Sequence, residues 1–192
     1  MQLTCALNAS ELTDGAECLL VLPEAISKHE LDEACRLLPR TIIVGAVPDA
    51  DSGHMRAYLV HEGTNRLKYL KTLSDGRSTG SGRHPETATY EAQDFIIGVL
   101  VCRDIENEVL RTSVLRTLNN STAPKKILCI PADMHGEWFT STKIAGYAGV
   151  FVAMSNNNRT YPVWRSKSFI ANPHGVRLST QDEYETVRAS VP

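Results

Sequence analysis

A chain of 192 residues is long enough for one domain with a sizeable core, which would bury roughly 70% of its unfolded surface. Its hydrophobic (42%) and charged (22%) fractions are those of an ordinary globular protein, and a net charge of -2 provides no basic surface for nucleic acid or an anionic membrane. The sequence has no run of about 18 apolar residues and no basic, apolar export signal at its start. We therefore expect a single domain over residues 1–192, located in the cytoplasm.

The five cysteines are expected to be reduced thiols. They are an odd number, they form no CxxC pair, and no histidine stands at a spacing from them that suits zinc. We therefore expect no disulfide, no metal site and no cofactor, and a chemical role for at most one cysteine.

Two short apolar runs near the N-terminus predict the first two strands. LTCAL ends at residue 7, and CLLVLPE occupies residues 18–24 after a polar link. The second run ends in Glu24, and a carboxylate at the mouth of a buried strand is partly desolvated, which suits it to general base work. The alternative is that Glu24 is an exposed loop carboxylate.

A helix, a strand and a hairpin follow. SKHE at residues 27–30 is a capping box and predicts the start of a helix, and residues 41–48 form an apolar run typical of a buried strand. The next two alternating arms, joined at residues 63–65, predict a hairpin. Its second arm carries Lys68 and Lys71, which face opposite sides of an extended strand, so only one of them can point at a pocket.

Residues 74–93 are rich in Gly, Ser, Thr and Pro and show no periodicity. The segment is too long for an ordinary connection, which predicts either a mobile lid or a disordered linker. A lid beside a reactive group would carry side chains that select the substrate.

The apolar run FIIGVLVCRD, at residues 95–104, delivers Cys102 to the carboxyl end of a buried strand. A helical stripe over residues 105–118 follows, so Cys102 stands between a strand and a helix. The positive end of the helix dipole would lower the pKa of the thiol there, and the unpaired backbone N–H groups offer an oxyanion site. An inert buried cysteine is the alternative, because a lone thiol after an apolar run usually serves only in packing.

The remaining chain predicts two more strands and a second hairpin. Residues 126–132 and 150–156 are apolar strands, and residues 138–149 between them favour a helix. The hairpin at residues 167–179 turns on a PHG sequence, and the polar tail from residue 181 is expected to be helical or loose.

The order of these pieces resembles the nitrilase, or carbon–nitrogen hydrolase, superfamily. LVLPE, KYLKT and IGVLVCRD look like its glutamate, lysine and cysteine signatures in the right chain order, and KILCIPADM, VFVAMSNNN and KSFIANPHGVRL look like its later segments. These blocks span most of the chain. The resemblance implies a short member with an α/β fold, a four-layer αββα sandwich of two mixed β-sheets flanked by helices, that forms a homodimer or a higher homo-oligomer.

The resemblance also implies a set of reacting groups. Glu24 matches the general base, Lys71 the lysine that stabilises the tetrahedral intermediate, and Cys102 the nucleophile. The backbone N–H of Arg103 would share the oxyanion with Lys71. Asp104, which matches the superfamily's aspartate after the cysteine, is expected to hold the turn and its arginine partners rather than to react.

Further residues are expected around the pocket. Many members of the superfamily have a second glutamate between the lysine and the cysteine, for which Glu86 is the candidate and Glu91 the runner-up. Met134, His135 and Asn156 follow strands near the expected pocket and are candidates for substrate binding, with packing or loop roles as the alternative.

The implied activity is cleavage of a small amide or nitrile through a cysteine thioester. Two other classes remain open: a binding or regulatory protein that keeps the fold without turnover, and an N-acyltransferase that passes the acyl group to an amine. Rapid alkylation of Cys102 by iodoacetamide near neutral pH would favour an enzyme over a binding protein, and a requirement for an amine would identify the transferase. A plain α/β domain with coincident residues is the remaining alternative.

Overall fold

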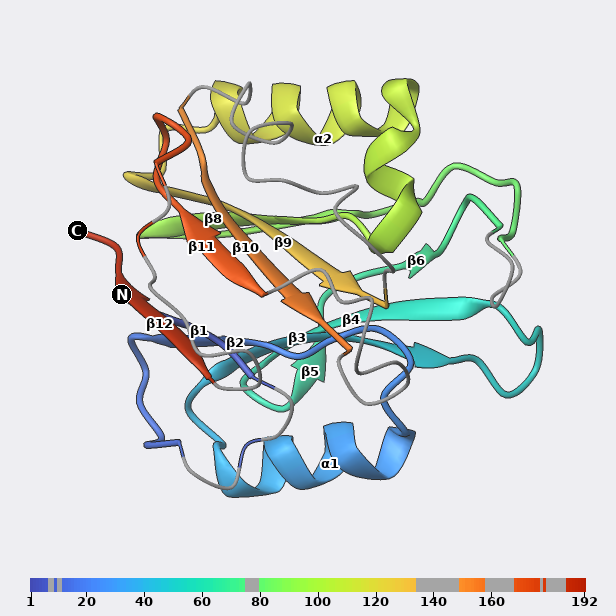
Figure 1. Ribbon diagram of the computed structural model, residues 1–192, viewed down its shortest axis with the longest axis horizontal. Helices are drawn as coiled ribbons and strands as arrows, with labels where there is room; N and C mark the ends of the chain where they lie inside the picture. Colours follow the sequence, from blue (N-terminus) through green and yellow to red (C-terminus); the bar gives the residue numbers. More distant parts are fainter. Residues whose placement is uncertain are drawn as a thin grey trace.

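The computed structural model describes residues 1–6, 9, 12–74, 80–133, 149–157, 168–176, 178 and 186–192. Figure 1 shows two β-sheets packed face to face, with helix α1 (Lys28–Leu37) outside one sheet and helix α2 (Glu108–Asn120) outside the other. The predicted four-layer αββα sandwich is therefore confirmed. Neither helix in this described part of the chain is long and apolar enough to cross a membrane.

The first sheet has seven strands. Their spatial order is β12 (Val187–Ser190), β1 (Gln2–Cys5), β2 (Cys18–Val21), β3 (Ile42–Pro48), β4 (Met55–His61) and β5 (Thr64–Asn65), with β6 (Tyr69–Leu70) also paired to β4. Strands β1, β2 and β3 are parallel, whereas β4 runs antiparallel to β3 and to both β5 and β6. The predicted first hairpin is thus confirmed. Its turn falls at Glu62 and Gly63, whose positive φ angles match the twist of the two arms.

The second sheet has five strands. Their order is β11 (Phe169–Ala171), β10 (Phe151–Asn156), β9 (Lys125–Ala132), β8 (Phe95–Val99) and β7 (Thr89–Ala92). The three inner strands are parallel and the two edge strands are antiparallel to them. The inner strands are apolar because helix α2 covers one face and the other sheet covers the opposite face. Parallel strands end at one edge of a sheet, so the loops after β8, β9 and β10 meet there.

The capping box predicted before α1 is present. The Glu30 N–H donates to the Ser27 hydroxyl oxygen at 3.1 Å, and the Ser27 N–H donates to the Glu30 carboxylate at 2.7 Å. Leu31 and Ala34 are then buried in a cluster with apolar side chains from the outer face of the first sheet. The helix therefore forms one outer layer of the sandwich.

The helix predicted over residues 105–118 begins later than expected. Cys102 opens a short 3-10 helix, η1 (Cys102–Glu106), and α2 begins at Glu108. Asn107 separates the two because its extended backbone ends η1 while its side chain accepts a hydrogen bond from the Leu110 N–H at 3.2 Å and caps α2.

Two segments that were expected to be irregular contain ordered structure where they are described. The C-terminal tail contains β12, which pairs antiparallel with β1, because Val187 and its alternating neighbours bury one side of the strand. In the segment over residues 74–93, the N–H groups of Ser81 and Gly82 donate to the carbonyls of Lys71 and Thr72 at 2.7 and 3.1 Å, and β7 follows. The described part of that segment is thus bonded along the strand that carries the lysine, rather than unstructured.

The described residues include only part of the predicted helix and of the second hairpin near the C-terminus. Residues 138–148 of the predicted helix lie outside the described residues. The second hairpin is confirmed where it is described, because the Leu178 N–H donates to the Ile170 carbonyl at 2.8 Å across a turn that contains Gly175 at positive φ.

The contact between α2 and β8 gives the first prediction. A Cβ atom at Gly98 would lie 2.7 Å from Cγ1 of Val114 and 3.2 Å from Cδ1 of Leu118, both on α2. The Gly98→Ala variant should therefore lose about 1–3 kcal/mol in its free energy of unfolding, measured by urea denaturation. In the double variant with Val114→Ala the loss should be smaller than the sum of the single losses, because the smaller side chain makes room. Additive losses would contradict this packing.

Candidate active site

The loops after three strands bring Glu24, Lys71 and Cys102 together. Glu24 follows β2, Lys71 directly follows β6, and Cys102 opens η1 shortly after β8. All three side chains lie in the interior, with exposed fractions of 2%, 0% and 1%. Residues remote in sequence therefore form one buried polar cluster.

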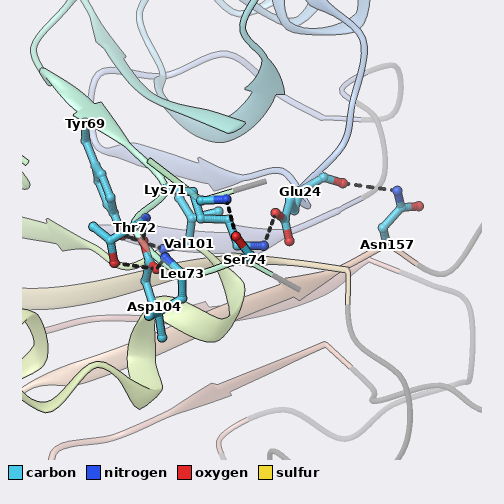
Figure 2. A network of polar contacts seen from close by, with 10 residues as sticks. Glu24, Tyr69, Lys71, Thr72, Leu73, Ser74, Val101, Asp104 and Asn157 are labelled. Carbon is cyan, nitrogen blue, oxygen red and sulfur yellow. Dashed lines mark hydrogen bonds and ion pairs between the residues drawn. The ribbon is translucent and has the colours of Figure 1, made fainter. Parts of the chain in front are cut away.

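Glu24 pairs with Lys71, and both charges act on Cys102. The Lys71 ammonium Nζ donates to Oε1 of Glu24 at 2.6 Å (Figure 2). Both charges act on the Cys102 thiol, because the Glu24 carboxylate raises its pKa and the Lys71 ammonium lowers it. Glu24 is thus near the thiol whose proton a general base would remove. The prediction that only one lysine of the hairpin faces inward is confirmed, because Lys68 is 76% exposed.

Cys102 has a strained backbone. Its φ angle is 49°, in the left-handed region that costs a residue with a Cβ roughly 1–2 kcal/mol. This conformation occurs where the chain passes from the end of β8 into η1, which Cys102 opens. Strain of this kind persists only where surrounding contacts hold it.

The expectation that the helix end lowers the thiol pKa was wrong. Burial raises the pKa of Cys102 well above its ordinary value, and the negative charge of Glu24 raises it further, whereas Lys71 and a backbone hydrogen bond from Asp133 lower it. Desolvation dominates because the thiol is almost completely enclosed. The resting sulfur is therefore a protonated thiol, and a base is needed to form the thiolate when it reacts.

Asp104 holds the turn after Cys102, but its described partners are not the expected arginines. The carboxylate accepts the Thr72 N–H at 2.8 Å, the Thr72 hydroxyl at 2.8 Å, the Leu73 N–H at 2.7 Å and the Tyr69 hydroxyl at 2.6 Å (Figure 2). These donors come from the residues that flank Lys71. Asp104 thus joins the turn of the cysteine to the strand of the lysine.

Asn157 is a site residue that the sequence reasoning missed. Its side-chain amide donates to the Glu24 carbonyl at 3.1 Å, and the Ala132 carbonyl accepts the N–H groups of both residues at 2.7 and 3.3 Å (Figure 2). The Asn157 amide therefore fixes the loop that presents Glu24. The run of three asparagines that begins at the last residue of β10 was the available signal, but the sequence did not indicate which of them faces this loop.

The side chains of Arg103 and of the two candidates for a second glutamate make contacts at the surface. The Arg103 backbone follows the cysteine in the first turn of η1, while its side chain pairs with Glu106 at the surface. Glu86 is 75% exposed and pairs with Lys68 at 3.4 Å. Glu91 accepts a hydrogen bond from the Ser121 hydroxyl at the end of α2. The structure thus gives both glutamates surface contacts and does not bring them to Glu24.

The candidates for substrate binding are only partly covered. Met134 and His135 lie outside the described residues. Asn156 is buried at the end of β10, in register with Ala132, and its backbone N–H donates to the Ser168 hydroxyl at 3.0 Å. It is therefore adjacent to the loop of Glu24. No group of three or more His, Cys, Asp and Glu side chains able to hold a metal ion occurs in the described part of the chain.

Comparison with known proteins identifies the fold. No family profile matches the chain, and no curated protein is significantly similar to it in sequence. A mutant of the amidase from Nesterenkonia sp. AN1, with acrylamide added at its active site cysteine, superposes with a TM-score of 0.72 at 17% identity, over 100% of this chain and 93% of that one. A cysteine-to-alanine mutant of the same amidase, in complex with butyramide, superposes with a TM-score of 0.72 at 17% identity. The match covers 100% of this chain and 91% of that one.

A second protein supports the same conclusion. Nit3 from Saccharomyces cerevisiae, a member of branch 10 of the nitrilase superfamily, superposes with a TM-score of 0.70 at 15% identity, over 98% of this chain and 89% of that one. The chain therefore has the fold of the nitrilase superfamily, as the resemblance of its motifs implied.

The raised thiol pKa predicts slow alkylation of Cys102. Because only the thiolate reacts, the rate with iodoacetamide at pH 7 should be well below that of the partly exposed Cys18 and Cys35, and it should still be rising above pH 9. Peptide mass spectrometry after timed alkylation measures each site separately. A plateau of the Cys102 rate near neutral pH would contradict the prediction. Slow alkylation thus does not separate an enzyme from a binding protein here.

The buried ion pair predicts a stability effect. Lys71→Met leaves the Glu24 carboxylate buried without its cation, so the free energy of unfolding should fall by about 3–5 kcal/mol. Adding Glu24→Gln should restore part of the loss, because the buried charge is then gone. Lys68→Met removes the exposed partner of Glu86 and should change stability by less than about 1 kcal/mol. Equal losses for the two lysine variants in urea denaturation would contradict the prediction.

Proposed function

We propose that this chain is a carbon–nitrogen hydrolase of the nitrilase superfamily that cleaves a small amide through a thioester on Cys102. The observation that carries the proposal is the buried contact of Glu24 with the Lys71 ammonium, beside a buried Cys102 thiol whose pKa both groups shift. The fold supports it, since solved amidases share it and one of them holds butyramide. An amide substrate is favoured over a nitrile for the same reason.

The first half of the reaction forms the thioester. As Sγ of Cys102 attacks the amide carbon, the thiol proton passes to the Glu24 carboxylate, so a free thiolate need not exist at rest. The carbonyl oxygen gains negative charge, which the Lys71 ammonium and the Arg103 N–H stabilise, at about 3 kcal/mol for each donor. Glu24 then gives its proton to the leaving nitrogen, the carbon–nitrogen bond breaks, and ammonia or an amine departs.

The second half releases the acid. Glu24, again a carboxylate, takes a proton from water as the water oxygen attacks the thioester carbon. The tetrahedral intermediate collapses, the carbon–sulfur bond breaks, and the sulfur recovers the proton from Glu24. One amide and one water are thus converted to one carboxylic acid and one amine, and the enzyme returns to its starting state.

The burial of the site explains why one carboxylate serves both halves. Glu24 is held by Lys71 on its side chain and by Asn157 on its carbonyl, so it stays within reach of the sulfur in each step. Buried charges also interact more strongly than charges in water, which strengthens the effect of Lys71 on the oxyanion.

Intact mass spectrometry tests the proposal. Wild-type protein exposed to a panel of small aliphatic amides should gain an acyl mass and release ammonia, because the thioester is a covalent intermediate. Cys102→Ala should show neither, whereas Cys35→Ala, which removes a partly exposed thiol on α1, should behave like the wild type.

Other outcomes identify the rival classes. An acyl adduct that turns over only after addition of an amine would indicate an N-acyltransferase. A folded wild-type protein with no adduct and no ammonia over the whole panel of amides would overturn the proposed amide hydrolase and favour a binding protein.

A further inference from the structure

The hydroxyl group of Tyr69 contacts the turn of the nucleophile on both sides. It accepts the Val101 N–H at 3.1 Å and donates to Oδ2 of Asp104 at 2.6 Å. Val101 immediately precedes Cys102, and Asp104 is the second residue after it. One oxygen atom thus closes the loop that holds Cys102 in its left-handed conformation.

Tyr69 also lies on the element that presents the lysine. It forms β6 with Leu70, and Lys71 follows directly. Strand β6 pairs with β4, and the Lys71 N–H donates to the Met55 carbonyl at 2.7 Å. A shift of the Tyr69 hydroxyl relative to the sheet would therefore change the position of Cys102 with respect to Lys71.

The environment makes this connection rigid. Tyr69 and Asp104 are both completely buried. Burial and the neighbouring Asp104 carboxylate raise the pKa of Tyr69, so its hydroxyl remains protonated and keeps its donor role. The Thr72 and Leu73 donors occupy the same carboxylate, which limits the ways in which Asp104 can rotate.

We propose that Tyr69 is a positioning residue, whose hydroxyl, through Val101 and Asp104, sets the nucleophilic sulfur at the correct place relative to Lys71. The inference rests on the proposed hydrolase function for its kinetic consequences. Its structural part, control of the conformation of Cys102, stands apart from turnover. Tyr69 itself does not touch the reacting atoms.

The Tyr69→Phe variant removes only this oxygen. It leaves the buried Val101 N–H without its acceptor and Asp104 with one donor fewer, so the turn of Cys102 should relax. With an amide substrate, kcat should fall by about 10- to 100-fold while KM changes by less than about threefold. Alkylation of Cys102 by iodoacetamide at pH 8 should become faster, because a relaxed turn lets water reach the thiol.

Tyr90→Phe is the matched control. It removes a hydroxyl that contacts Nδ1 of His61 at 2.9 Å, between β7 and β4, and thus also takes one hydrogen bond from the sandwich. Its melting temperature should fall by a similar or smaller amount, but kcat and the alkylation rate of Cys102 should equal those of the wild type. A general loss of stability would affect both variants, whereas positioning affects only Tyr69→Phe.

Several outcomes would overturn the proposal. Tyr69→Phe with wild-type kcat and wild-type alkylation of Cys102 would do so, as would equal losses of kcat in the two phenylalanine variants. If the wild type hydrolyses no amide, the function fails, while the alkylation comparison still decides the positioning role.

A second pair of variants covers the case in which Tyr69→Phe does not fold. Thr72→Val removes one donor from Asp104 and should lower kcat and raise the alkylation rate of Cys102 in the same sense. Thr72→Ser keeps the hydroxyl and should restore both quantities. Failure of Thr72→Ser to restore them, or no effect of Thr72→Val, would count against positioning through Asp104.

Discussion

The site depends on keeping one ammonium, one carboxylate and one thiol together away from water. Burying either charge alone costs several kcal/mol, and the contact of Lys71 with Glu24 offsets that cost for both. Cys102 adds no charge, because its own burial keeps it protonated. The cluster is thus electrically neutral at rest. In the proposed reaction, moving the proton from sulfur to carboxylate leaves the total charge of the cluster unchanged, so the interior would not have to accommodate a new net charge during the attack.

Such a cluster requires loops that are fixed by hydrogen bonds rather than by regular secondary structure. The Ala132 carbonyl accepts two N–H groups and so joins the ends of β2, β9 and β10. The Asp104 carboxylate accepts donors on both sides of Lys71 and so joins the end of β6 to η1. Figure 2 shows the Asp104 contacts on one side of the Lys71 side chain and the contact of the Asn157 amide with the Glu24 carbonyl on the other. The Ala132 contacts fix the loop of Glu24, and the Asp104 contacts fix Lys71 and the turn of Cys102. These contacts maintain the strained backbone of Cys102.

Local sequence patterns predicted most of the strands and helix α1, and the resemblance to the nitrilase superfamily selected Glu24, Lys71 and Cys102, which the structure buries together. The apolar runs, the capping box and the alternation that lets only one of Lys68 and Lys71 face inward all act over a few residues, where sequence and structure are directly related. Properties that depend on contacts between distant segments were not predicted from the sequence. The short polar strand β12 forms only because β1 offers it a partner, and the thiol pKa depends on burial by several elements. The role of Asn157 depends on loops that meet only in the folded chain.

The enclosed, protonated state of Cys102 also bears on oxidative damage. Peroxides attack thiolates to give sulfenic acid and then higher oxides, and both steps require access to the sulfur. With 1% of the residue exposed and its proton retained, Cys102 is a poor target for such oxidants, whereas a thiol activated permanently would be consumed between turnovers. In the proposed hydrolase, a thiol that is activated only when a substrate occupies the site would thus be protected from oxidants in the surrounding solution.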